Sequence, residues 1–511
     1  MRFISCKSSY FQLSTIAIYY QAKTQQLAQF ADSLVEYLPL SAATQQAKDN
    51  NLICDMYEGH APFKPRYVLP DYQLFLQQGS KYLELEPAQD FDDALNNLMI
   101  LYHFVPSVTN IPVFIGHLDQ LLMPYVGELS EEQIYSKLKR FWIMLDRVLP
   151  DAFMHANIGP SDNIVCRTIL KIDAELAQIA PNLSLLFDTE KTPESLLLQA
   201  CENIATTSKP HIVNHNMHKQ KYAEKGYGVV SCYNVLPVAG GCNTLVRVNL
   251  KGVAEQANSI TDFMQVQLPL YCQAAYELIE ARCQFLHKDS NFFDHFLVQE
   301  GILDEKRFAP MFGIYGMAEC INTLLSKEQL QGHYGEDQNA NALALEITQL
   351  VAKIVDQTEV PYGYHGRALL HSQGGLNSDV DVTPGIRIEY GTEPDPITHL
   401  MSLAPQHQYF TSGVSEILTL EPTVRGNPQA IQQLCKGAFN HGIGIFTANV
   451  ATNDLVRITG YMVRMSDINK LSEQGSRTNT TALADGAIKS THVSQRQPRV
   501  VSHEFNHWQN K

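Results

Sequence analysis

Cys232 is one of two residues in this 511-residue chain whose type and setting best suit chemistry. It lies in GYGVVSCYNVLPVAGG, where an apolar strand runs into the cysteine and a loop rich in proline and glycine follows. Such a loop can present a sulfur atom at its tip. Cysteines at strand ends are more often small packing residues, and no basic residue adjoins this one to stabilise a thiolate. The stretch alone leaves a functional thiol and a structural one both open.

Gly460 is the second candidate, in VRITGYMVRMSD at residues 456–467. The alternation of apolar residues predicts a strand or a tight hairpin. Glycine suits a strand poorly, because it packs nothing and costs backbone entropy. Taken alone, Gly460 indicates a bulge or the close approach of another backbone.

Two further stretches place polar residues next to predicted strand ends. HIVNHNMHKQ spaces His215 and His218 as a metal pair on a helix would, but no carboxylate or thiol completes a ligand set. Polar residues that line a pocket are the favoured interpretation, and no metal site is expected. FGIYGMAECINTLL sets Gly313 and Gly316 before Glu319, which indicates close backbone packing or a phosphate approach. It does not match the G-x-G-x-x-G fingerprint, so it is weak as a nucleotide motif.

The elements that must hold these residues follow a strand-then-helix pattern. Residues 110–126 contain a short apolar stretch, a glycine and an amphipathic run. Residues 181–205 give a strand, a turn and a helix that is expected to start at Thr192-Pro193, with proline in the first helical position. Alternating β and α units predict an α/β protein with substantial parallel pairing.

Helices are predicted at the N-terminal side as well. Residues 11–105 are mainly of helical pattern, with apolar residues recurring at three and four in 24–38 and 91–105. Ser130 and Gln133 form a Ser-x-x-Gln arrangement suited to cap the helix that follows.

Composition excludes several classes of protein. Hydrophobic residues make up 45% and charged residues 18%, as in an ordinary globular chain. The net charge of −15 argues against binding to nucleic acid or to an anionic membrane, both of which need a basic face. The ten cysteines form no CxxC pair, which excludes the common zinc and ferredoxin patterns. No signal peptide or membrane span is evident, and a cytoplasmic location is expected.

Together these stretches resemble the glycyl radical enzymes. LVRITGYMVR is similar to their C-terminal signature, Arg-[Val/Ile]-x-Gly-Tyr, with Gly460 in the place of the radical glycine. PNLSLLFDTEKTPESLLLQACENI, KPHIVNH, YGVVSCYN and RVNLKGVAEQA follow the order of the central region of that family. The thiyl cysteine of the family falls on Cys232 and not on Cys242. The resemblance spans roughly residues 110–470.

The superfamily includes pyruvate formate-lyase and the anaerobic class III ribonucleotide reductases, and two stretches indicate which of its families the chain resembles most. FGIYGMAECINTLL is similar to a strand-and-helix segment of the anaerobic reductases. SCYNVLPVAGGCNTLVRVNL looks most like the YjjI family. The chain is therefore identified as a member of this superfamily, closest to the YjjI family.

The resemblance implies a ten-stranded α/β barrel surrounded by helices, with the loops of Cys232 and Gly460 meeting at its centre. It implies a helical region at 1–105 packed on the barrel, a barrel core at 106–434 and a glycyl radical domain at 435–511. A separate radical S-adenosylmethionine activating enzyme would install the radical on Gly460, and no tightly bound cofactor is expected. Glycine suits this role because a delocalised Cα radical must become planar, which a Cβ would crowd.

Supporting roles are expected for other residues. Asn214, His215, Asn234 and Glu319 are the candidates to line the substrate pocket. Arg457 and Tyr461 are expected to hold the radical loop in place.

The chain departs from the better-known branches at three points. Ser231 precedes Cys232, where pyruvate formate-lyases carry two adjacent cysteines. Asn234 stands where the diol dehydratases carry a glutamate base, and an amide cannot accept that proton. No cysteine follows Cys435, so the four-cysteine zinc site of the anaerobic reductases is missing from this sequence.

The expected function is thiyl-initiated hydrogen abstraction from a small polar substrate under anaerobic conditions. The alternatives are a nucleotide or nucleoside reductase and a catalytically inactive barrel scaffold. The sequence leaves open the substrate and whether the reaction is an elimination, a cleavage or a reduction. The expected partners are the activating enzyme and the small molecule, and a homodimer is a candidate assembly.

Overall fold

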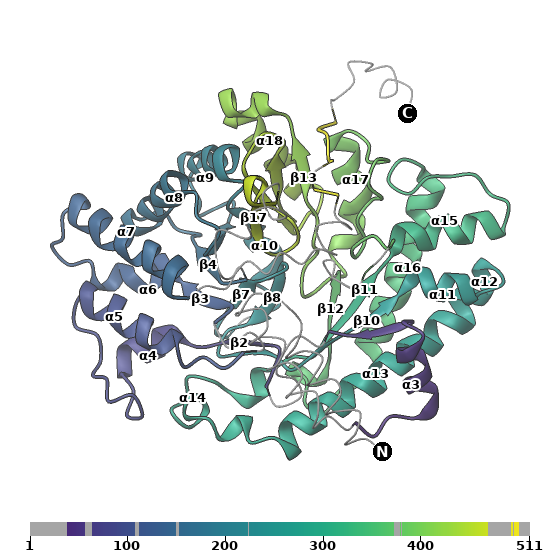
Figure 1. Ribbon diagram of the computed structural model, residues 1–511, viewed down its shortest axis with the longest axis horizontal. Coiled ribbons are helices and arrows are strands. Elements are labelled where there is room, and N and C mark those ends of the chain that lie inside the picture. Colours follow the sequence, from purple (N-terminus) through teal and green to yellow (C-terminus); the bar gives the residue numbers. More distant parts are fainter. Residues whose placement is uncertain are drawn as a thin grey trace, which may run out of the picture.

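The computed structural model describes residues 38–56, 64–107, 112–149, 153–222, 224–372, 379, 381–468, 492–493 and 495–499. The helix predicted at 24–38 lies almost wholly outside the described residues. The predicted α/β class is confirmed: helices and two larger sheets alternate along the chain (Figure 1).

The first sheet has five strands in the order β14-β6-β5-β4-β3. Its bounds are β3 Phe114–His117, β4 His155–Ile158, β5 Asn182–Phe187, β6 His211–Asn214 and β14 Ile445–Phe446. Strands β3 to β6 run parallel and β14 runs antiparallel to β6. The helices that follow these strands are α6 Leu118–Leu122, α7 Glu131–Val148, α8 Ile164–Leu176 and α9 Glu194–Thr207. They cover one face of the sheet, at the left of Figure 1.

The second sheet has the order β1-β10-β11-β12. Its bounds are β1 Ile53–Asp55, β10 Leu245–Asn249, β11 Met311–Tyr315 and β12 Leu369–Ser372, with β10 to β12 parallel. Its helices are α3 Ala42–Asp49, α11 Leu250–Gln256, α13 Leu268–Gln284, α15 Met317–Lys327, α16 Gln338–Gln357 and α17 Pro396–His407.

A short segment extends the second sheet past β12. The Ser412 nitrogen donates to the Leu370 oxygen at 2.9 Å, and the Ser372 nitrogen donates to the Gly413 oxygen at 3.2 Å. These bonds follow a strand ladder. With this segment each sheet has five members, the number that two halves of a ten-stranded barrel require.

A hairpin lies between the two sheets (Figure 1). It consists of β7 Tyr227–Val230 and β8 Asn234–Pro237, which pair antiparallel with Cys232 at the turn. The side-chain amide of Asn157 on β4 exchanges two hydrogen bonds with the Val229 backbone, at 2.8 and 2.9 Å. On the other side the Val235 nitrogen donates to the Ser412 oxygen at 3.1 Å. The hairpin is thus fixed to both sheets.

The C-terminal part forms the predicted hairpin around Gly460. Strands β16 Leu455–Arg457 and β17 Met462–Arg464 pair antiparallel, and Gly460 lies in their connection. Before it, β13 Leu418–Leu420 pairs parallel with β15 Ala448–Val450, and α18 Pro428–Asn440 packs on α9.

The faces of β5 explain why polar residues lie inside the fold. Leu183 and Leu185 pack with the helix-side core, whereas Asn182 and Ser184 alternate with them and point to the opposite face. All six residues of the strand are buried. The inner side of β5 thus carries the polar Asn182 and Ser184 besides the apolar Leu186, which indicates an interior that is not purely apolar.

Details of the predicted elements can be compared with the structure. The capping box of Ser130 and Gln133 is present. Pro193 is the N-cap of α9 and not its first helical residue. The described residues between 38 and 105 hold α3, α4 Tyr72–Gln78 and α5 Phe91–Tyr102, and also β1 and β2 Tyr67–Leu69, which pairs with β9 Gly240–Cys242. The domain boundaries at 105 and 434 stay a prediction.

The remaining turns of helix are short. They are η1 Met123–Tyr125, α10 His215–His218, α12 Ile260–Asp262, η2 Phe263–Gln267, η3 Phe285–Asp289, η4 Phe292–Asp294, α14 Phe296–Gln299, η5 Glu305–Arg307, η6 Tyr364–Gly366 and η7 Pro422–Gly426. Of the helices in the described part of the chain, none is both long and apolar enough to cross a bilayer.

Candidate active site at the Cys232 and Gly460 loops

Gly460 lies in direct contact with the peptide that joins Ser231 to Cys232. A Cβ placed on Gly460 would come within 2.2 Å of the Cys232 nitrogen and of the Ser231 carbonyl carbon, and within 2.3 Å of the Cys232 Cα. These are backbone atoms of a hairpin that is anchored on both sides, so they cannot yield as a flexible side chain would. The close backbone approach that Gly460 predicts is present, and the approaching backbone is that of Cys232.

The turn around Cys232 has an unusual backbone. Ser231 and Tyr233 adopt left-handed conformations with φ of 47° and 67°. Neither is a glycine, and such a conformation costs about 1–2 kcal/mol per residue. Surrounding contacts must therefore hold the turn in this shape. The result is a buried thiol, 5% exposed, at the tip of the central hairpin.

The thiol of Cys232 faces the loop that carries Gly460. Its Sγ lies 3.7 Å from the Thr459 Oγ1, to which the thiol can donate, and Thr459 directly precedes Gly460. The Ser231 hydroxyl donates to the same sulfur at 3.7 Å, and the Tyr67 hydroxyl donates to Ser231 at 3.3 Å. The sulfur therefore contacts the hydroxyl groups of Ser231 and Thr459.

Asn182 and Arg457 form hydrogen bonds around the loop of Gly460. The Asn182 Nδ2 donates to the Gly460 oxygen at 2.5 Å, and the Arg457 Nη1 donates to the Asn182 Oδ1 at 2.8 Å. The Arg457 Nη2 donates to the Ser208 oxygen at 3.2 Å. Asn449 bonds both the backbone nitrogen and the backbone oxygen of Arg457, at 2.8 and 2.9 Å. Arg457 thus contacts Asn182, Ser208 and Asn449, and its role as a support of the Gly460 loop stays a prediction.

Burial acts on the charge of Arg457. Loss of hydration lowers the pKa of its guanidinium to about 10, while Tyr233, Asp173 and Cys232 act in the opposite direction. The guanidinium still carries its charge at neutral pH. Tyr461, the other expected support, is buried with its ring edge-on to Phe153 at 5.2 Å.

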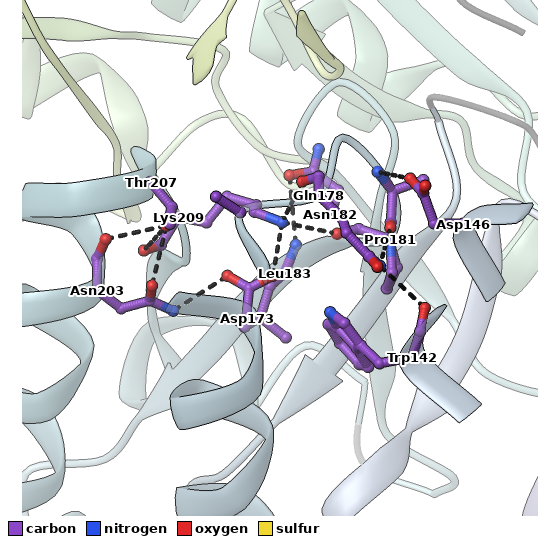
Figure 2. A network of polar contacts seen from close by, with 12 residues as sticks. Trp142, Asp146, Asp173, Gln178, Pro181, Asn182, Leu183, Asn203, Thr207 and Lys209 are labelled. Atoms are coloured by element: carbon purple, nitrogen blue, oxygen red, sulfur yellow. Dashed lines mark hydrogen bonds and ion pairs between the residues drawn. The ribbon is translucent and has the colours of Figure 1, made fainter. Parts of the chain in front are cut away.

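A buried ion pair fixes the start of β5, as Figure 2 shows. The Lys209 Nζ lies 2.6 Å from the Asp173 carboxylate, and both side chains are fully buried. The same ammonium group donates to the backbone oxygens of Gln178 and Pro181 at 2.9 and 3.2 Å. Because Pro181 directly precedes Asn182, this network also positions the amide that binds Gly460.

Two buried histidines lie beside the thiol loop and were not predicted from the sequence. The His155 Nε2 is 2.8 Å from the Ser184 Oγ, and the His211 Nδ1 is 2.7 Å from the Thr447 Oγ1. Their rings stack at 5.3 Å, and the His211 ring meets that of Tyr233 edge-on at 4.5 Å. Burial lowers the pKa of both imidazoles well below the ordinary value, and the charge of Arg457 lowers both further. Both rings are therefore neutral at pH 7.

The sequence does contain a signal for this inner face. His155 and Asn157 alternate in β4, and Asn182 and Ser184 alternate in β5. Polar residues two apart in an otherwise apolar buried strand point to the same side. Neither pair belongs to a catalytic motif, so the pattern indicates a polar interior without naming a reaction.

The expected pocket residues lie in three places. Asn234 is buried in the central hairpin, where its Nδ2 donates to the Val230 oxygen at 3.0 Å. Asn214 caps α10 by accepting from the Met217 nitrogen at 3.2 Å. The His215 Nδ1 lies 2.9 Å from the Tyr227 hydroxyl, and burial lowers the pKa of this half-buried imidazole.

Glu319 lies on α15, on the second sheet. Its carboxylate accepts from the backbone nitrogen of Thr383 at 2.9 Å and from the Thr383 hydroxyl. Burial raises the pKa of this carboxyl group. These contacts tie Glu319 to the segment after β12, so the structure brings together Cys232, Asn234, Arg457 and Gly460 but connects Glu319 elsewhere.

Cys242 was the other thiol considered. It lies on β9, fully buried, with its Sγ donating to the Thr244 oxygen at 3.0 Å. Burial raises the pKa of this thiol to about 12. A protonated thiol bonded to a backbone carbonyl fits a structural role.

Sequence comparison finds one matching family model and similar proteins in two bacteria. A model of the YjjI-like glycyl radical enzyme family matches residues 18–499. The uncharacterised protein YjjI of Escherichia coli (strain K12) is 54% identical over 485 residues, which is 95% of this chain and 94% of that protein. An uncharacterised protein of Haemophilus influenzae is 36% identical over 490 residues, covering 94% of this chain and 95% of that protein.

Solved structures of glycyl radical enzymes share the fold. Hydroxyproline dehydratase from Clostridioides difficile, with trans-4-hydroxy-L-proline bound, has a TM-score of 0.72 at 14% identity and covers 96% of this chain and 88% of its own. The glycerol-bound B12-independent glycerol dehydratase from Clostridium butyricum has 0.69 at 12%, covering 93% and 84%. The anaerobic ribonucleotide reductase from Thermotoga maritima, in complex with dATP and CTP, has 0.68 at 10%, covering 90% and 92%. At such low sequence identities the comparison shows a shared fold only. That fold is the barrel-type fold of the glycyl radical enzymes.

Proposed function

The chain belongs to the YjjI-like family of glycyl radical enzymes, and on that premise we propose that Cys232 starts radical chemistry on a small polar substrate under anaerobic conditions. The observation that carries this proposal is the contact between Gly460 and the Cys232 backbone. Two loops far apart in sequence meet where one offers a Cα without a side chain and the other a thiol.

The surroundings of Gly460 fit a radical on its Cα. When present, that radical can take the hydrogen atom of a thiol, which leaves the unpaired electron on the sulfur. The missing side chain leaves the Cα free to flatten, and Asn182 holds the adjacent carbonyl in a fixed plane. The hairpin is buried, so bulk water is kept from this position.

Cys232 is the proposed carrier between Gly460 and substrate. Its thiol hydrogen passes to the Gly460 Cα, and the sulfur then takes one hydrogen atom from a substrate C–H bond. After the substrate has reacted, the hydrogen returns to the product and the original state is restored. One S–H and one C–H bond are exchanged at each transfer, so the initiation step needs no added oxidant or reductant.

The substrate class is proposed from the chemistry of the interior and from the structural neighbours. Two of the dehydratase structures hold trans-4-hydroxy-L-proline and glycerol, both small hydroxylated molecules. We propose a small hydroxylated substrate, with elimination as the first reaction to test. Because Asn234 cannot serve as a base, any proton transfer must involve another group.

A nucleotide reductase is the second candidate, favoured by the likeness to the reductase that holds dATP and CTP. Reduction of a nucleotide requires an electron donor, so dependence on formate or on a thiol pair would select this candidate. An inactive scaffold is less well supported, because Cys232 and Gly460 are both present and lie in contact.

The activating enzyme must reach Gly460, which is buried in this structure. We propose that residues 435–511 act as the radical domain and that the hairpin at 455–464 leaves the core to meet a radical S-adenosylmethionine activating enzyme. A cytoplasmic location, a homodimeric assembly and the lack of a tightly bound cofactor are part of the same proposal.

Solvent deuterium tests the proposed hydrogen exchange without knowledge of the substrate. The α-hydrogen of a glycyl radical splits its paramagnetic resonance signal into a doublet. In D₂O, exchange through the Cys232 thiol should replace that hydrogen by deuterium and collapse the splitting. Cys232→Ala should keep the doublet, while the control Cys242→Ala should lose it as the wild type does. A collapse at the wild-type rate in Cys232→Ala would contradict the proposal.

A further inference from the structure

The second sheet carries a row of four residues in one register, three of which have a thiol, guanidinium or imidazole side chain. Cys54, Arg247, Gly313 and His371 pair across β1, β10, β11 and β12. Paired residues of neighbouring strands point to the same face of a sheet. The residues that alternate with them pack against the outer helices; these are Val246, Val248, Phe312, Ile314 and Leu370. The row therefore faces the inside of the fold, toward the first sheet.

The row ends at the hairpin that carries Cys232. The His371 Nδ1 lies 2.8 Å from the Ser412 oxygen, which also accepts from the Val235 nitrogen at 3.1 Å. Neighbouring strands lie about 4.8 Å apart, so Arg247 is roughly 10 Å from His371 along the row. The row and the thiol hairpin therefore face the same interior.

Arg247 and Tyr315 form a cradle on this face. The Arg247 guanidinium is fully buried and lies 4.0 Å from the centre of the Tyr315 ring. A Cβ on Gly313 would come within 2.8 Å of the Arg247 Cγ, so this glycine gives the arginine its place. The sequence indicates close backbone packing or a phosphate approach at Gly313, whereas the atoms nearest to it belong to the side chains of Arg247 and Leu245.

The cradle offers hydrogen-bond donors without acceptors. Among the described residues, neither the Arg247 Nε nor the Tyr315 hydroxyl has a hydrogen-bond partner, and both atoms are buried. A buried donor without an acceptor costs free energy, and an oxygen atom of a ligand would remove that cost. An acceptor oxygen of a ligand would satisfy either donor.

Asp379 determines the charge of the cradle. Its carboxylate accepts from the Arg247 Nη1 at 2.7 Å and from the Nη2 at 2.9 Å, and the pair is buried. The pair carries no net charge. A ligand carboxylate at the Arg247 Nε would lie beside the Asp379 carboxylate in a medium of low dielectric, where like charges repel strongly. A hydroxyl or carbonyl oxygen meets no such repulsion.

We propose that Arg247 and Tyr315 anchor an uncharged hydroxyl or carbonyl oxygen of the substrate, and that Asp379 sets this preference by neutralising Arg247. The subsite deepens the proposed function and rests on it, since it takes the ligand of this interior to be the substrate. It selects a polyol or a hydroxy-carbonyl compound over the corresponding carboxylate.

Matched ligands test the proposal on the full-length protein before activation. Glycerol is compared with glycerate, and 1,2-propanediol with lactate, by titration calorimetry or ligand-observed NMR. Each pair differs mainly by the change of a CH₂OH group to a carboxylate. The wild type should bind the uncharged member of each pair at least tenfold more tightly. Asp379→Asn should shift that ratio at least tenfold toward the carboxylate.

Two further variants separate this role from a structural one. Tyr315→Phe should weaken binding of the uncharged ligands about fivefold and leave the charge preference unchanged. Asp55→Asn is the matched control, because Asp55 pairs with the buried Arg282 from the neighbouring strand β1. It should leave the ratio unchanged. Binding of none of the four ligands, tighter binding of carboxylates by the wild type, or an unchanged ratio in a folded Asp379→Asn protein would each overturn the subsite. None of these outcomes bears on the radical at Gly460, which this experiment does not involve.

Discussion

The Cα of Gly460 lies against the backbone nitrogen of Cys232, at a distance that leaves no room for a side chain. The turn at Cys232 contains two residues in the strained left-handed conformation, Ser231 and Tyr233. Both loops are fixed by side chains from the strands around them. The contact therefore depends on residues outside the two loops, and each of these residues can be tested by substitution.

Asn182→Ala should loosen the loop of Gly460 without unfolding the protein. The change leaves the Gly460 oxygen and the Arg457 guanidinium each without one partner, which costs about 1–3 kcal/mol per buried group. Hydrogen exchange of residues 455–464 should speed up at least tenfold. Asn96→Ala, at an exposed helical position, is the control and should leave this exchange unchanged. Equal protection in the Asn182 variant would show that the loop does not depend on this amide.

Thr459→Val should slow hydrogen transfer between Cys232 and Gly460. The valine keeps the shape of the side chain but removes the oxygen to which the Cys232 thiol can donate. A less well oriented thiol should slow the deuterium exchange of the activated protein about tenfold, with the yield of radical unchanged. Thr452→Val, at an exposed position in the same part of the chain, should have no effect. A wild-type exchange rate in Thr459→Val would rule out an orienting role.

Removal of the ammonium group in Lys209→Met should destabilise the protein by about 3–5 kcal/mol, because it leaves the Asp173 carboxylate buried without its charge partner. The double change Lys209→Met with Asp173→Leu should recover part of this loss. Chemical denaturation measures both. Lys137→Met breaks the exposed pair with Asp92 and should cost less than about 1 kcal/mol. A loss as small for Lys209 would mean that the network in Figure 2 contributes little.

Acid should destabilise the fold through His155 and His211. Their pKa values in the folded protein lie well below the unfolded value of about 6.5, so below that pH the unfolded chain binds more protons. The stability is fully present above pH 6.5 and falls as the pH decreases toward the folded pKa. Each such histidine contributes a slope of at most about 1.4 kcal/mol per pH unit.

His211→Gln should therefore lose about 1 kcal/mol less than the wild type between pH 6.5 and 5.5. Denaturation curves at the two pH values give this difference directly. His441→Gln, at an exposed position, should keep the wild-type slope. A parallel decline in His211→Gln and wild type would assign the acid sensitivity to other groups.

Much of this arrangement can be predicted from the sequence because it is encoded locally. Alternation of apolar residues predicts the strands, the Ser130 box predicts α7, and the glycine in VRITGYMVR predicts a close backbone approach. The order of motifs then joins Gly460 to Cys232. The resemblance implies that these two loops meet, and the structure adds that the atoms nearest to Gly460 are those of the peptide between Ser231 and Cys232.

The supporting residues could not be predicted, because they come from strands that are distant in sequence. Asn182, His155 and His211 are isolated polar residues in apolar strands, and only the packing of the outer helices decides that they face inward. Glu319 follows two glycines at a helix start, a position typical of ligand binding. Its carboxylate meets Thr383, which the fold brings there from the segment after β12.

Anaerobic activation followed by paramagnetic resonance tests the central claim most directly. The wild type, incubated with a radical S-adenosylmethionine activating enzyme, should give the doublet of a glycyl radical. Exposure to air should then cut the chain at Gly460 and release a fragment that begins near that residue. Gly460→Ala should give no doublet and no fragment, while Cys232→Ala should give both. A glycyl doublet in Gly460→Ala, or an intact wild-type chain after the signal has been lost in air, would contradict the assignment of the radical to Gly460.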